Sequence, residues 1–511
     1  MISYLPKTNT DDLLRFARTR MKPLLDHPLL EPFEPILKSL LELGFDGGVR
    51  SLSAAGYKLG DDLVNDDARE HFRNGLFSSF AQTQSAVGML FIELEAKRRE
   101  LSEQAKCLRS NREPAQQAAQ EQLQAVESRQ AILRRLMDGI LWVLLPEVWM
   151  ARHLAFQRNV GQPDPDELRR ILAIAKEQNQ TSKREIHLVT DLTTIAQIGD
   201  IIRIRWDKDD VYLRLQEIKF GKVNDTLSHI IDSGGDTLSE TDLAAVETKL
   251  GRHARIQATR MIRQRERIKK FGSIMAREAR PNDLPKDDVL EALGKAEPPK
   301  MVTYLSELPE LAADVKARGW GVHGIDGCLW LVGMSERGLA ELGLADLKHL
   351  PHFLFHIKHP KLKCQIEERE TLKREPPLVN LAAHNMTYVM SRSPLIWYPK
   401  DLILDVMMNR IQIYVQFDLD AFFRIAAKAG MQLTLITGKE AEEGKRTKVS
   451  SPMLENPKAY GVKVKFANGR VMKLRSSLFR DVYANLIPPS QILRLIATLD
   501  KVQQGVGKSS A

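Results

Sequence analysis

The segment from residue 199 to residue 220 constrains the fold more than any other, because its apolar residues recur with a period of two. Side chains alternate across a β-strand, so this period predicts two strands, 199–206 and 211–220, joined by an acidic turn at 207–210. Symmetric pairing of the two strands about Lys208 and Asp209 predicts three apolar cross-strand pairs: Trp206 with Val211, Ile204 with Leu213, and Ile202 with Leu215.

The same register places Asp200 opposite Glu217 and puts Lys219 on their face. Two carboxylates facing each other at the end of an apolar face repel, and a divalent cation such as Mg²⁺ would remove that cost. A lysine ammonium on the same face would stabilise negative charge that develops during phosphodiester cleavage. The pattern therefore predicts a metal site. The alternative is a surface hairpin whose Glu217 and Lys219 are solvated strand ends.

At these residues the chain resembles the PD-(D/E)XK nuclease superfamily, which has the restriction-endonuclease-like fold. Its signature is an aspartate on one strand and (D/E)-x-K on the adjacent antiparallel strand, matched here by Asp200 and by Glu217-Ile218-Lys219. The resemblance implies that Asp200, Glu217 and the main-chain carbonyl of Ile218 bind Mg²⁺ or Mn²⁺, and that Lys219 positions or activates water. The usual proline before the aspartate is absent, since Ile198 and Gly199 stand there.

Basic residues predict an anionic partner. The net charge of +9 favours nucleic acid, with DNA preferred over RNA only through the resemblance. The densest basic segment lies in an expected helix, 240–271, whose Ile256 and Met261 are expected to face the sheet. The candidate phosphate contacts are Arg252, Arg255, Arg260, Arg263, Arg267 and Lys270. A merely solvated helix face is the alternative.

Several further residues are secondary candidates. The resemblance implies a glutamine near the metal, Gln257 or Gln264, and Glu147 or Glu167 could add a ligand from a helix. Four histidines cluster at His349, His352, His356 and His359. The pair His352 and His356 has zinc-compatible helical spacing, but Pro351 and Pro360 and the neighbouring lysines favour a basic loop instead.

The first 160 residues are expected to be helical, with a turn at 46–48. Two long apolar-faced stretches, separated by a break at 110–114, predict an antiparallel helical hairpin. Its apolar residues Leu94, Leu101, Val126 and Leu133 are candidates for holding a homo-oligomer or a partner protein.

These elements predict an α/β (α+β) multidomain protein with three domains. They are a helical domain at 1–160, a nuclease-like core with a mixed sheet at 161–335, and a basic α/β domain at 336–511. Strands are expected at 411–417, 432–436 and 461–466, a hairpin at 321–333, and helices at 166–178, 311–318, 421–429 and 489–499. Three isolated cysteines, no signal peptide and no membrane span are typical of a cytoplasmic protein.

The function that follows is a metal-dependent nuclease. Its architecture, with extra domains and no nucleotide-driven motor motif, resembles effectors of anti-phage defence. Two alternatives stay open: a non-catalytic nucleic-acid-binding or scaffolding protein that keeps the nuclease fold, and a DNA repair or recombination nuclease.

Overall fold

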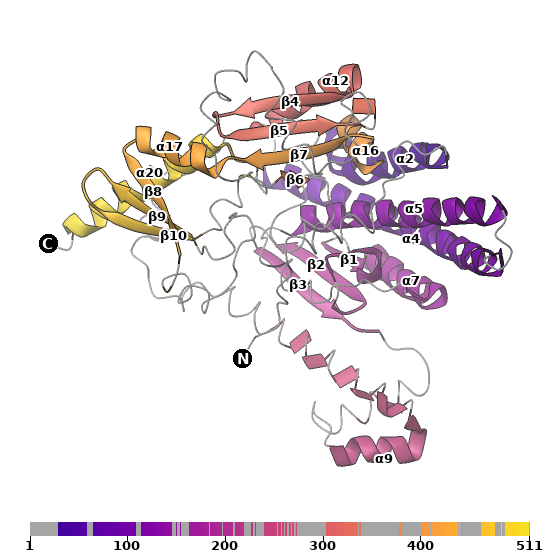
Figure 1. The fold of residues 1–511 in the computed structure, drawn as a ribbon. Helices are drawn as coiled ribbons and strands as arrows, with labels where there is room; N and C mark the ends of the chain where they lie inside the picture. The colour runs from indigo at the N-terminus through magenta and orange to yellow at the C-terminus, as the bar shows by residue number, and fades with distance from the viewer. Residues whose placement is uncertain are drawn as a thin grey trace. The chain divides into compact units, whose positions relative to one another are not determined.

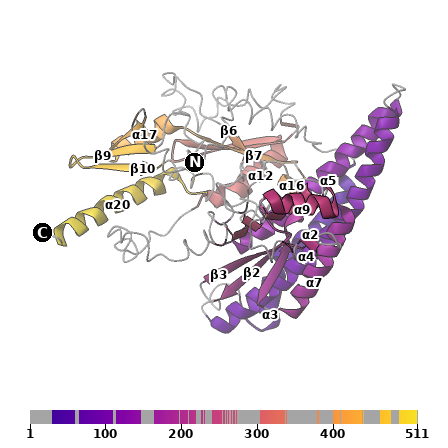
Figure 2. The same cartoon turned by 90° about the horizontal axis from the view of Figure 1, so that it is seen from below.

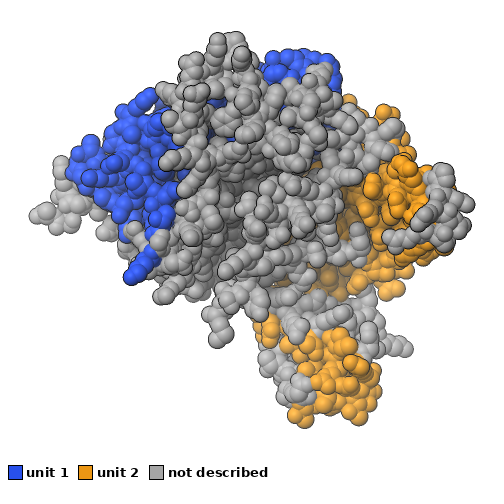
Figure 3. All heavy atoms as spheres, viewed as in Figure 1, with its two compact units in different colours: residues 1–26, 284–511 blue, residues 27–283 orange. Residues whose placement is uncertain are grey.

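The computed structural model describes residues 29–58, 65–108, 114–145, 163–182, 184–196, 198–207, 210–218, 303–335, 400–408, 410–437, 461–475 and 486–509, with shorter pieces at 226–272, 337–338, 378–380 and single positions elsewhere. Contacts within the chain divide it into two compact units (Figure 3). Unit 2 comprises residues 27–283, and unit 1 comprises 1–26 and 284–511.

The first part of unit 2 is helical, as expected. A 3₁₀ turn at Glu31–Phe33 leads into α2 (Glu34–Phe45), α3 (Gly47–Ala54), α4 (Asp66–Leu108) and α5 (Pro114–Leu144). The long helices α4 and α5 lie side by side, which confirms the predicted hairpin (Figures 1 and 2). Leu94, Leu101, Val126 and Leu133 are at most 7% exposed, so these four side chains are not available to a second chain.

The predicted turn at 46–48 is confirmed only at Asp46, which separates α2 from α3, because α3 already begins at Gly47. The glycines allow α3 to approach α4 closely. A Cβ on Gly47 would lie 1.6 Å from the Ser79 hydroxyl oxygen, and one on Gly75 would lie 2.6 Å from the Gly47 carbonyl oxygen. Gly47 and Gly75 therefore allow α3 and α4 to pack closely against each other.

Helix α7 (Pro165–Thr181) leads into a three-stranded sheet of β1 (Glu185–Val189), β2 (Ile201–Asp207) and β3 (Asp210–Gln216). The strand order is β1-β2-β3, and both pairings are antiparallel. The predicted register is confirmed: Trp206 pairs with Val211, Ile204 with Leu213, and Ile202 with Leu215. The sequence analysis did not predict β1. The described strands of this sheet contain no parallel pair, so the mixed sheet is not seen in them.

Helices cover both the apolar face and the outer edge of this sheet. Trp206 packs edge-to-face on Phe77 of α4, with ring centroids 5.4 Å apart. Its indole N–H donates to the Leu144 carbonyl oxygen of α5 at 3.1 Å. At the edge, Gln84 of α4 accepts from Val189 N–H at 2.7 Å and donates to the His187 carbonyl oxygen at 2.9 Å. Along this edge of β1, the Gln84 side chain thus makes main-chain hydrogen bonds that a neighbouring strand would otherwise make.

Two predictions made from the sequence are wrong for the segment that follows the β2–β3 hairpin. The single helix expected at 240–271 is interrupted, since α9 spans Glu240–Leu250 and Gly251 follows with φ +88°. Only glycine adopts such a conformation at no cost, which explains the break. Met261 is buried among helical residues such as Leu243 and Val246, and Ile256 is 46% exposed, so neither packs on the sheet as predicted.

Unit 1 contains two further antiparallel sheets. One has the order β4-β5-β7-β6 and packs on α12 (Glu307–Arg318); the other has the order β10-β9-β8 and packs on α17 (Leu419–Lys428) (Figure 1). Their strands are β4 (Trp320–Ile325), β5 (Leu329–Met334), β6 (Leu378–Asn380), β7 (Gln412–Phe417), β8 (Met431–Ile436), β9 (Gly461–Phe466) and β10 (Val471–Arg475). Unit 1 also contains the 3₁₀ turn Tyr304–Ser306 and the helices α16 (Lys400–Met407) and α20 (Pro489–Ser509).

The architecture is α+β, but the observed units differ from the three predicted domains. The boundary expected at 160/161 falls inside unit 2. The boundary expected at 335/336 separates β5 from β7, which pair from Leu329 with Phe417 to Met334 with Gln412. Within the described residues, no helix combines the length and apolar composition that crossing a bilayer requires.

Candidate active site

Asp200 lies directly before β2, and hydrogen bonds fix it from both neighbouring strands. Its main-chain N–H donates to the Gln216 carbonyl oxygen at 2.8 Å, and its carbonyl oxygen accepts from Thr190 N–H at 3.0 Å. Its carboxylate accepts from Ile218 N–H at 2.5 Å. The side chain is therefore held at the end of β3, beside the residues of the predicted E-x-K motif.

Gly199 has a backbone conformation that excludes proline at this position. Its φ is +71°, whereas proline is restricted to a φ near −65°. A Cβ at this position would lie 3.1 Å from the Gln216 carbonyl oxygen, tighter than an ordinary contact. The Thr190 hydroxyl donates to the Gly199 carbonyl oxygen at 2.6 Å, which further fixes the entry into Asp200.

Glu217 and Ile218 follow β3 directly. The last regular pairs of the ladder are Ile202 with Leu215 and Ile201 with Gln216, so continuing the register sets Asp200 against Glu217. The Oε2 atom of Glu217 is buried from solvent. The structure thus brings Asp200, Glu217 and Ile218 to one end of the hairpin, while Lys219 lies outside the described residues.

An acid that the sequence analysis missed, Asp191, lies in the 3₁₀ turn Thr190–Leu192 after β1. Burial raises the pKa of Asp191, and the charges of Glu167 and Glu217 raise it further, while Arg134 of α5 opposes the shift. Arg134 is 8% exposed and its guanidinium lies 5.1 Å from the centre of the Phe91 ring. Because strand β1 was not predicted from the sequence, there was no basis for placing Asp191 near the hairpin.

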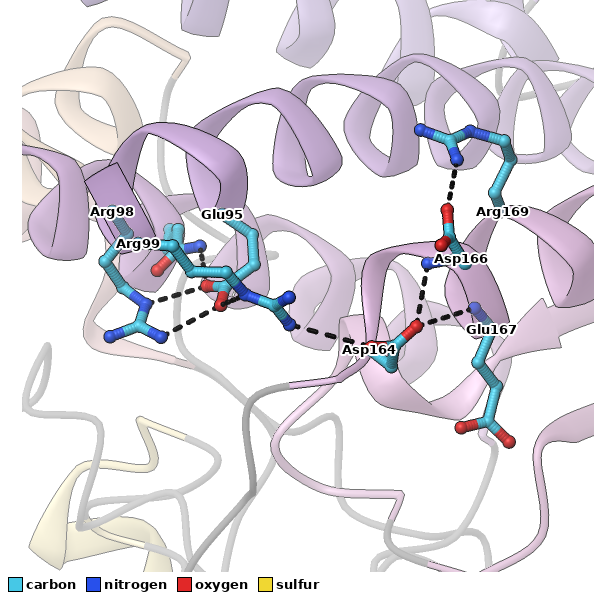
Figure 4. Close-up of polar contacts among 8 residues, drawn as sticks. Glu95, Arg98, Arg99, Asp164, Asp166, Glu167 and Arg169 are labelled. Carbon is cyan, nitrogen blue, oxygen red and sulfur yellow. Dashed lines mark hydrogen bonds and ion pairs between the residues drawn. The ribbon is translucent and has the colours of Figure 1, made fainter. Parts of the chain in front are cut away.

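The long helix α4 holds the start of α7, the helix that carries Glu167 (Figure 4). Asp164 caps α7 by accepting from Asp166 N–H at 3.0 Å and from Glu167 N–H at 3.2 Å, and these bonds lower its pKa. Arg99 bridges this cap to Glu95, with an N–O distance of 3.7 Å to Asp164 and 3.1 Å to Glu95. Asp164 is thus the N-cap of α7, and Glu167 is an exposed residue of its first turn.

The donor set at the end of the hairpin fits a hard divalent cation. Carboxylate and main-chain oxygens are the ligands that Mg²⁺ and Mn²⁺ prefer. Asp191, Asp200 and Glu217 do not form a set of three ligand atoms within 4.8 Å of one another. Asp200, Glu217 and the main-chain carbonyl of Ile218 are the ligands that the resemblance implies, and their oxygen atoms are of the kind that such a cation binds.

Only part of the predicted nucleic-acid surface is described. Arg252 is exposed, whereas Arg255 forms an ion pair with Glu247 at 2.6 Å. The side chains of Arg260, Arg263, Arg267 and Lys270 lie outside the described residues, as do Gln257, Gln264, Glu147 and the four clustered histidines.

Comparison with known proteins completes the description of the site. No protein-family model, no curated protein and no solved structure matches this chain. The geometry and chemistry of the site are therefore the basis for a functional conclusion.

Proposed function

We propose that this chain is a metal-dependent nuclease that hydrolyses phosphodiester bonds, with DNA as the expected substrate. The observation that supports the proposal is the hairpin register. Three apolar cross-strand pairs lead to Asp200 and Glu217 at the next position, in an α-β-β-β order of α7, β1, β2 and β3. The two acids on adjacent antiparallel strands agree with the resemblance to the PD-(D/E)XK superfamily.

Each residue has a defined role in the proposal. Asp200 and Glu217 provide carboxylate oxygens and Ile218 a carbonyl oxygen to Mg²⁺ or Mn²⁺. When bound, the cation polarises a phosphoryl oxygen and acidifies a water molecule. Ile218 N–H orients the Asp200 carboxylate, because it donates to one of its two oxygens. Lys219 is expected to hold the attacking water or the phosphate through its ammonium group.

The acidic surroundings explain why a cation is needed before a substrate binds. Asp191 is costly to ionise because it is buried, and the charge of Glu217 adds to that cost. A phosphodiester is an anion and would be repelled by the same carboxylates. A bound divalent cation reverses the local charge and allows the phosphate to approach.

The proposal is tested with the purified chain on labelled linear and circular DNA, and on RNA, with Mg²⁺ or Mn²⁺ and with EDTA. We expect metal-dependent cleavage, lost in EDTA and reduced at least about 100-fold in Glu217→Gln and in Lys219→Ala, since each removes a group that acts in the transition state. Glu177→Gln is the matched control, because Glu177 is an exposed acid of α7.

Two outcomes would contradict the proposal. Cleavage that is equal in wild type and Glu217→Gln would mean that the hairpin is not the active site. Nucleic-acid binding without cleavage or metal binding would indicate the scaffolding alternative instead.

A further inference from the structure

A second group of metal-binding side chains lies in unit 1, remote in sequence from the hairpin. Glu307 and Glu310 of α12 and His323 of β4 each present one ligand atom, and these atoms all lie within 4.8 Å of one another. Among the described residues, no other group of three such side chains meets this criterion. Two carboxylates and one imidazole are a donor set suited to a divalent transition-metal ion.

The packing of α12 on β4 creates this group. Glu307, Glu310 and Asp314 are three and four residues apart, so they share one face of α12. A Cβ on Gly321 of β4 would lie 2.9 Å from the Cβ of Asp314, which shows how closely the strand approaches this face. His323 is two residues along the strand from Gly321 and therefore faces α12 as well.

Both ring nitrogens of His323 face carboxylates. Nδ1 lies 3.2 Å from a carboxylate oxygen of Glu307, and Nε2 lies 3.4 Å from a carboxylate oxygen of Asp314. A neutral imidazole carries a proton on one nitrogen only, so one of these contacts would place a lone pair against a carboxylate. A cation on that nitrogen removes the repulsion, and the cation is either a second proton or a metal ion.

The arrangement of Asp314 favours a metal ion on Nδ1. A histidine that binds a metal usually donates its other N–H to a carboxylate, which fixes the tautomer and the ring orientation. The Asp314 carboxylate lies in this position, beside Nε2. It is itself held by Arg318, whose guanidinium nitrogen lies 2.6 Å from a carboxylate oxygen of Asp314. Glu310 is exposed, and its carboxylate lies close enough to the same atoms to provide a third ligand.

We propose that Glu307, Glu310 and Nδ1 of His323 bind a divalent transition-metal ion, with Zn²⁺ as the best match, and that Asp314 orients the imidazole. The three protein ligands leave at least one coordination position to water, because Zn²⁺ in proteins takes four or more ligands. The ion would cross-link the first turn of α12 to β4. This site is separate from the proposed nuclease site and does not depend on it.

The test is Zn²⁺ titration of the full chain by calorimetry, in the Asp200→Asn/Glu217→Gln background so that the hairpin contributes no binding. We expect this protein to bind one Zn²⁺ equivalent more than the same protein carrying His323→Ala. Asp314→Asn should weaken that binding about 10- to 100-fold, as loss of an orienting carboxylate does elsewhere. Co²⁺ substitution should give a visible absorption spectrum that is lost with His323→Ala.

Matched variants separate loss of a ligand from loss of folding. Glu310→Gln changes an exposed side chain and should also remove the bound equivalent, while His71→Ala changes an exposed histidine of α4 and should leave binding unchanged. Equal Zn²⁺ stoichiometry and affinity in the background protein, His323→Ala and Glu310→Gln would overturn the proposal. Absence of Zn²⁺ binding in the background protein would overturn it as well.

Discussion

At the scale of single residues, two buried acids in the helical part of unit 2 have opposite pKa shifts. Burial opposes ionisation of Glu95, but hydrogen bonds from Arg98, Gln130 and Arg99 outweigh it and lower the pKa to about 2. Burial of Asp138 dominates and raises its pKa to about 6, although Thr194 and Ile195 donate hydrogen bonds to its carboxylate. The two acids therefore respond to pH in opposite directions.

Glu95 should stabilise the fold at neutral pH. A depressed carboxyl pKa gives stability that is present above about pH 4.5 and is lost as the pH falls toward 2. We expect Glu95→Gln to reduce the free energy of unfolding by on the order of 2–3 kcal/mol at pH 7 and by less than half of that at pH 3. Urea unfolding at both pH values measures this. An equal loss at the two pH values would contradict the ionic explanation.

Asp138 should show the reverse dependence. Its raised pKa means that stability is fully present below about pH 3.8 and is lost as the pH rises through 6. Relative to Asp138→Asn, the wild-type free energy of unfolding should fall by on the order of 2–3 kcal/mol between pH 4 and pH 7. A difference between the two proteins that does not change with pH would show that Asp138 is not protonated in the folded state near pH 5.

At the scale of elements, the edge of β1 offers a direct test of how the sheet is stabilised. Gln84→Leu preserves the volume of the side chain but leaves Val189 N–H buried without its acceptor. We expect a loss of about 1–3 kcal/mol in the free energy of unfolding, the cost of one unsatisfied buried group. Gln82→Leu, an exposed neighbour on α4, is the control and should change stability by less than about 0.5 kcal/mol.

The hairpin could be predicted from sequence because its signal is local. Alternation fixed the face of each side chain, and the acidic turn fixed the register, so the pairs Ile204–Leu213 and Ile202–Leu215 followed directly. Strand β1 was missed because four of its five residues are buried and show no alternation. Its edge is completed by Gln84, a residue about a hundred positions earlier, which no local pattern reveals.

The same limit applies to the candidate site. Asp200 and Glu217 lie on the predicted hairpin, so their proximity could be inferred from register alone. Asp191 follows β1, which pairs with β2, and the start of the helix that carries Glu167 is held to α4 by Arg99. Such contacts depend on tertiary packing between segments that are distant in sequence, and composition and periodicity contain no information on them.

At the scale of the whole molecule, pairing between strands that are distant in sequence determines which segments belong to the same unit. The hairpin of β4 and β5 was correctly predicted, yet its partner is β7, about eighty residues later, and not the nuclease-like sheet. The positions of the strands were predictable, but their partners were not, because β5 is buried along its whole length and fits any apolar neighbour.

We propose that Asp200 is a metal ligand of a nuclease. The most direct test is the rate of Mg²⁺- or Mn²⁺-dependent DNA cleavage by wild type, by Asp200→Asn and by Asp166→Asn, an exposed acid of α7 that serves as the control. We predict cleavage by the wild type and the control at the same rate, and a loss of at least about 100-fold in Asp200→Asn with its thermal stability retained within a few degrees. Cleavage by folded Asp200→Asn at the wild-type rate would contradict the assignment.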